Sequence, residues 1–92
     1  MKEQTENRIA IISIIVEDTT SAEALNGILH QYADVIIGRM GIPYHKRGIH
    51  IISVAADAPQ DVISALSGKI GALTGVTSKA VYSRASYNDA CL

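Results

Sequence analysis

The side chains best suited to binding a ligand gather around one predicted turn, which joins two apolar runs near the middle of the chain. Gly41, Pro43 and Gly48 favour a reversal there, because glycine permits positive φ and proline fixes its own φ and supplies no N–H. Arginine forms forked hydrogen bonds with carboxylates and phosphates, and tyrosine and histidine add further polar groups. The turn is therefore a candidate site for a small effector. Its candidate ligand-binding residues are Arg39, Tyr44, His45, Arg47 and His50.

Two other interpretations of this turn stay open. A cluster of cationic side chains, which here includes Lys46, is often simply solvated. It can also form the rim of an interface and pair with acidic groups such as Glu17 and Asp18 of a neighbouring subunit. Both interpretations remain alternatives to ligand binding, and the cofactor, if there is one, stays unknown.

Metal binding by the histidines is the weaker prediction. His45 and His50 flank the turn and His30 lies on a predicted helix, so the three imidazoles share a metal only if the fold or a second subunit brings them together. The single cysteine, Cys91, excludes an intramolecular disulfide and a CxxC metal motif. We therefore assign no metal site.

Recognisable catalytic motifs are absent from the sequence. It contains no Ser/His/Asp set, no glycine-rich phosphate loop and no HExxH motif. Asp57 and Asp61 are interpreted as the acidic start of a helix rather than as paired catalytic carboxylates, because acidic groups complement the positive end of the helix dipole. We predict that the protein is not an enzyme. The least favoured alternative is a small enzyme that uses His45 or His50.

Length and composition limit the range of functions. The chain has 92 residues, which indicates one small domain, and its formal net charge of −1 disfavours direct binding to nucleic acid. Its hydrophobic fraction is 48%, with no tryptophan or phenylalanine. The apolar run near the N-terminus is too short to span a membrane and has no cleavage site typical of a signal peptide. We expect a cytoplasmic protein that does not associate with membranes.

The first half of the chain predicts a strand, a helix and a second strand. Residues 8–16 are apolar on both alternating faces and too few for a core helix, which is typical of a central strand. Thr20 and Glu23 form a capping-box pattern at the start of a helix over residues 21–33. Residues 34–42 predict an edge strand, because glycines and an arginine interrupt the apolar run.

The second half predicts another strand, helix and strand. Residues 48–56 are again apolar on both faces, which indicates a second central strand. Residues 57–61 open a helix with Pro59 at its first position, and residues 76–83 form an edge strand. The predicted division is a disordered lead-in at 1–7, a single domain at 8–84 and a tail at 85–92.

The element order β-α-β-β-α-β predicts an α+β, ferredoxin-like sandwich with sheet order 4-1-3-2 and both helices on one face. The other face of the two central strands is then apolar and uncovered, and such a surface usually marks an interface. We predict a homo-oligomer, a dimer or a tetramer. The alternative is that the chain termini cover this face. The predicted interface residues are Ile11, Ser13, Ile15, Ile51 and Ser53.

Three segments resemble the iron-only hydrogenase system regulator family. They are IIGRMGIPYHKRGIHIISV, DAPQDVISALSGKIG and GVTSKAVYS, within a match from about Ile9 to Ser83. The resemblance implies a stand-alone ACT-like domain, similar to the effector-binding domain of the nickel-responsive repressor. Two departures matter. The loop EDTTS lacks the glycine that amino-acid-binding ACT domains usually have, and the chain lacks the repressor's metal-ligand series and DNA-binding segment.

The resemblance implies a regulatory module that binds a small effector, such as an amino acid or a metal, near the turn and the loop after the first strand. A second protein would then carry the output. The alternative, from a different class, is a structural or adaptor oligomer that docks a protein partner and binds no small molecule.

Overall fold

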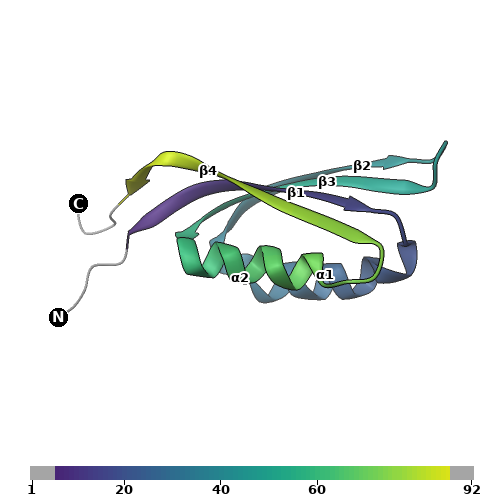
Figure 1. Cartoon of the computed structure of the whole chain (residues 1–92), viewed down its shortest axis with the longest axis horizontal. Helices are drawn as coiled ribbons and strands as arrows, with labels where there is room; N and C mark the ends of the chain where they lie inside the picture. The colour runs from purple at the N-terminus through teal and green to yellow at the C-terminus, as the bar shows by residue number, and fades with distance from the viewer. Residues whose placement is uncertain (1–5, 88–92) are drawn as a thin grey trace.

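The computed structural model describes residues 6–87, which form four strands and two helices with short 3-10 turns between them (Figure 1). Residues 1–5 and 88–92 lie outside the described part, so most of the predicted lead-in and tail, including Cys91, is not described. The elements are β1 (Asn7–Val16), η1 (Thr19–Ser21), α1 (Ala22–Gln31), η2 (Ala33–Val35), β2 (Ile36–Tyr44), β3 (Ile49–Pro59), α2 (Gln60–Gly71) and β4 (Val76–Tyr87).

The strands form one antiparallel sheet in the order β2-β3-β1-β4, which is the predicted 4-1-3-2 order read from the opposite edge. Both helices pack against the same face of the sheet (Figure 1). The predicted α+β, ferredoxin-like class is therefore confirmed, with β1 and β3 in the centre.

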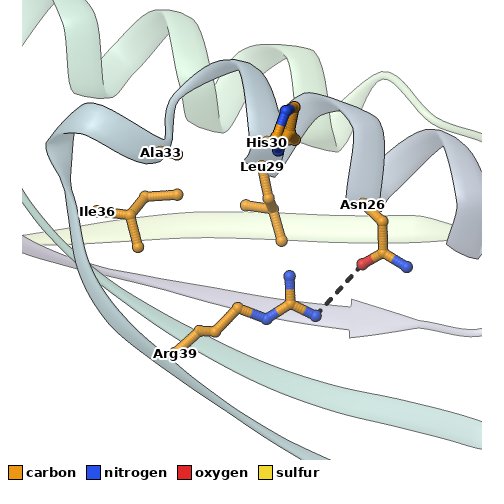
Figure 2. A pocket seen from close by; sticks show the side chains of 6 residues that line it. All are labelled: Asn26, Leu29, His30, Ala33, Ile36 and Arg39. Atoms are coloured by element: carbon orange, nitrogen blue, oxygen red, sulfur yellow. Dashed lines mark hydrogen bonds between the residues drawn. The ribbon is translucent and has the colours of Figure 1, made fainter.

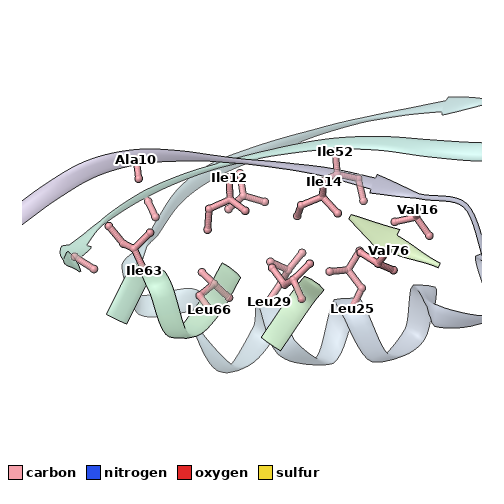
Figure 3. Packing of buried hydrophobic residues seen from close by; sticks show 14 residues of the cluster. Ala10, Ile12, Ile14, Val16, Leu25, Leu29, Ile52, Ile63, Leu66 and Val76 are labelled. Atoms are coloured by element: carbon pink, nitrogen blue, oxygen red, sulfur yellow. The ribbon is translucent and has the colours of Figure 1, made fainter. Parts of the chain in front are cut away.

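The core lies between the helices and one face of the sheet (Figure 3). Alternate residues of β1 point into it, so Ile12 and Ile14 are almost completely buried while Ile11 and Ile15 remain exposed. The helices contribute one apolar stripe each. Burial of an aliphatic side chain contributes about 1.5–3 kcal/mol, so this shared layer is the main source of stability. The helical core residues are Leu25, Leu29, Ile63, Leu66 and Ile70.

The first helix begins differently from the prediction. The Thr20–Glu23 capping box does not form, and Ser21 at the N-cap of α1 makes no capping bond with its side chain. Instead, Asp18 Oδ1 accepts hydrogen bonds from the Thr20 N–H at 3.0 Å and the Thr20 hydroxyl at 2.6 Å, which shapes η1. These bonds hold the pKa of Asp18 below its ordinary value of 3.8, the hydroxyl contributing most.

The predicted start of the second helix was also too early. β3 continues through Pro59, which is the N-cap of α2, and Asp57 lies within the strand opposite Ile9. The interpretation of Asp57 as part of the acidic start of this helix is therefore wrong. At the other end of the chain, β4 continues to Tyr87, four residues beyond the predicted end at Ser83, because its last residues pair with the start of β1.

Candidate functional site

The sheet has one uncovered face that carries large apolar side chains. Ile11 is 47% exposed, and Ile15 and Ile51 are each 42% exposed, although all three lie on the central strands. The edge strands continue the apolar surface, because Val81 pairs with Ile11 and Ile42 pairs with Ile51. We call this surface the open face. Its large apolar residues are Ile11, Ile15, Met40, Ile42, Tyr44, Ile51 and Val81.

The middle of the open face is small and polar. Ser13 lies directly opposite Ser53 on β3 and opposite Lys79 on β4. The five predicted interface residues, including both serines, therefore share one face, as expected from their spacing in the sequence. The two central strands contribute no charged side chain to this row, and the one charge beside it, that of Lys79, comes from an edge strand. Charge depletion at the centre is typical of protein interfaces.

A hollow of about 300 Å³ lies beside the serine pair. It exists because Gly38 contributes no side chain there, and a Cβ atom at this position would meet no atom within 4 Å. Met40, the most exposed of the large apolar residues at 70%, stands next to it. The open face thus has a projection and a depression side by side. The lining residues are Ile11, Gly38, Arg39, Met40, Ser53 and Ala55.

A second hollow, of about 310 Å³, lies on the opposite side of the sheet, between α1 and β2 (Figure 2). Arg39 is paired with the buried Val54, so its side chain extends from β2 towards the helices. Its Nη2 donates a hydrogen bond to Asn26 Oδ1 of α1 at 3.3 Å (Figure 2). We call this space the α1–β2 hollow; it is lined by Asn26, Leu29, His30, Ala33, Ile36 and Arg39.

The structure places Arg39 apart from the other predicted ligand-binding residues. Tyr44 ends β2 on the open face, while His45 and Arg47 lie in the exposed turn that follows. His50 is on the helix side of β3, but four residues along the strand from the partner of Arg39. The predicted site is therefore not one cluster. Among residues 6–87, no group of three or more His, Cys, Asp or Glu side chains is arranged to hold a metal ion.

The contact between Asn26 and Arg39 was not predicted from the sequence, because the direction of the Arg39 side chain depends on the register of β2. That register shifts between Ile36 and Gly38, where the pairing with β3 is irregular. The glycines flanking the arginine were the available signal, since glycine within a strand often marks a bulge.

These features define a small ferredoxin-like α+β domain with one uncovered apolar sheet face. The chain belongs to the TM1266-like family, described as "Iron-only hydrogenase system regulator, putative", whose model matches residues 8–80. The resemblance seen in the sequence is therefore confirmed at the level of the family. Within residues 6–87, no helix is long and apolar enough to cross a membrane.

One solved structure similar to this chain is described as that of the uncharacterized protein TM1266 from Thermotoga maritima. The two sequences are 33% identical over 84% of this chain and 98% of the other, and the TM-score is 0.80. The two proteins therefore share the fold over most of the length of both chains. A comparison with curated proteins found no match.

Proposed function

We propose that this chain is a regulatory module of an iron-only hydrogenase system that self-associates through its open face and responds to a small effector. The family description supports the regulatory role. The open face supports self-association, because Ile11, Ile15 and Ile51 are each more than 40% exposed in the single chain. Soluble proteins rarely leave a contiguous apolar surface of this kind uncovered.

A second copy of the chain suits this surface better than an unrelated protein. In a dimer with two-fold symmetry the same patch is used twice, so a projection on each copy must find a depression on the other. Met40 provides the projection and the gap above Gly38 provides the depression, next to the Ser13–Ser53 pair. Ser13 and Ser53 carry no charge, so the two central strands of one copy would not repel those of the other in such a contact.

The effector role is supported by the presence of two hollows of about 300 and 310 Å³, one on each side of the sheet. Volumes of this size correspond to the lower end of sites for small molecules and cofactors. A ligand that binds only the native protein stabilises it by RT ln(1 + [L]/Kd), or about 2.7 kcal/mol at a hundredfold excess over Kd. In a domain of this size, that stabilisation raises Tm by roughly 10 °C or more.

The two parts of the proposal require two measurements. Sedimentation equilibrium over a range of concentrations should give a mass that rises to a multiple of the 9.8 kDa chain. Thermal unfolding against a panel of amino acids, small carboxylates, nucleotides and divalent metals, with a chelator control, should reveal a selective increase in Tm. A monomer at every concentration contradicts self-association through the open face. A flat panel contradicts the effector role and favours the adaptor function.

A further inference from the structure

We propose that the α1–β2 hollow binds a small monocarboxylate with a short aliphatic chain. This inference rests on the effector role proposed above and assigns it a site. Arg39 and Asn26 form the polar end of the hollow, and their side chains are held together by one hydrogen bond of 3.3 Å (Figure 2). This contact holds the guanidinium on the helix side of the sheet, at the solvent-exposed mouth of the hollow.

The charge of Arg39 is not neutralised within the described part of the chain. Its bond to Asn26 is made to a neutral amide oxygen, and residues 6–87 provide no carboxylate partner for it. A guanidinium has five N–H donors, so several remain to donate hydrogen bonds to a carboxylate in a forked arrangement. The Asn26 amide nitrogen can donate a further bond to the same oxygen atoms. The polar end of the hollow therefore favours an anion.

The rest of the hollow is apolar. Leu29 is 3% exposed and forms part of the core, while Ala33 and Ile36 extend the lining towards the start of β2. Inorganic phosphate would leave the apolar lining of the hollow exposed to water, whereas an alkyl chain attached to a carboxylate would bury it. His30 lies at the rim, where an imidazole can form a hydrogen bond with a substituent on the ligand. The lining thus selects a polar head with a short apolar tail.

Two acidic residues limit the charge of the ligand. Glu23 precedes Asn26 by about one turn of α1, and Asp34 follows the helix in η2, although neither lines the hollow. Their negative charges repel a multiply charged anion more strongly than a monoanion. A volume of about 310 Å³ lies at the lower end of the range for small-molecule sites, which suits a small acid better than a nucleotide. A monocarboxylate of a few carbon atoms satisfies these conditions.

The test is an NMR titration of the ¹⁵N-labelled protein with butyrate at millimolar concentrations. Butanol has the same chain without the charge, butylamine has the opposite charge, and phosphate has no chain. We expect saturable shifts of amides in residues 26–39 with butyrate only. Loss of a charged hydrogen bond weakens binding about ten- to hundredfold, so Arg39→Gln should raise Kd by that factor. Arg47→Gln, which removes the same charge from the exposed turn, should leave Kd unchanged.

The inference is overturned if butyrate produces no saturable shifts, if butanol produces the same ones, or if Arg39→Gln binds as tightly as the wild type. The amide spectrum of each variant shows whether the fold is retained. Sedimentation of the same samples separates this result from self-association, because the hollow and the open face are on opposite sides of the sheet. A monomer that binds butyrate supports the site while contradicting the association surface.

Discussion

A single charge at the centre of the open face should separate folding from association. Ser13 is exposed and lies opposite both Ser53 and Lys79. In the isolated chain, Ser13→Glu places a carboxylate across from an ammonium group, and a cross-strand pair of opposite charges contributes about 0.2–1 kcal/mol. The free energy of unfolding should therefore stay the same or rise slightly.

In the associated state the same substitution is unfavourable. Each copy would bring one carboxylate into a surface that has lost its water, and the effective penalty for burying an ion is several kcal/mol. Taking about 3 kcal/mol as a low value for the dimer, Kd rises about 150-fold. The pair with Lys79 at the edge of the sheet offsets only a small part of this cost.

Sedimentation equilibrium measures this change in Kd, and denaturant unfolding at a concentration where the chain is monomeric measures the stability of the fold. The matched control is Ala65→Glu, which adds the same charge at an exposed position of α2 in the helix layer. It should leave Kd within about a factor of two to three, since exposed charges interact weakly. Equal Kd values for Ser13→Glu and the wild type would refute the assignment of the interface.

Three further predictions concern glycines and one carboxylate. Gly38→Leu should weaken association without unfolding the chain. A side chain at this position meets no atom in the monomer, but a leucine fills the hollow that the second copy would occupy. Sedimentation measures the association, and circular dichroism shows whether the fold is retained. Gly75→Ala should lower the free energy of unfolding by at least about 2 kcal/mol, as measured by denaturant unfolding. The reason is that Gly75 has a φ of +70° and that a Cβ there would lie 2.9 Å from the backbone nitrogen of Asp18. An unchanged unfolding midpoint would contradict this close approach. Thr20→Val should raise the pKa of Asp18 towards 3.8 in an NMR titration of the carboxyl carbon, since the hydroxyl donor is lost. The bonds from Thr20 stabilise the fold above the unfolded-state pKa of Asp18, and this contribution disappears as the pH falls through the folded-state pKa, so wild type and variant should converge in strong acid.

The sheet could be predicted from sequence because its signal is periodic. Alternation in β1 places Ile12 on one face and Ile11 on the other, and both are apolar, so a central strand follows from the pattern alone. The same pattern predicts that Ser13 and Ser53 lie on one face of the two central strands, and the structure pairs them directly. Topology then fixes the sheet order, since few arrangements accommodate this element order.

The start of each helix and the position of Arg39 could not be predicted in this way. Asp18 competes with Thr20 for the capping role, and a short side chain can satisfy nearby backbone groups in several ways. The hydrogen bond between Arg39 and Asn26 across the α1–β2 hollow depends on tertiary packing. Arg39 meets Asn26 only because β2 shifts its register near Gly38, and a shift of one residue moves a side chain to the other face.

The most direct test of the open face is the solvent exposure of individual isoleucine methyl groups, measured by NMR with a soluble paramagnetic gadolinium complex. Ile12, which is fully buried, provides the internal reference. We predict that relaxation of the Ile11, Ile15 and Ile51 methyls by the complex falls towards the value for Ile12 as protein concentration increases. If these methyls remain equally accessible at every concentration, the open face is not covered by a second copy of the chain.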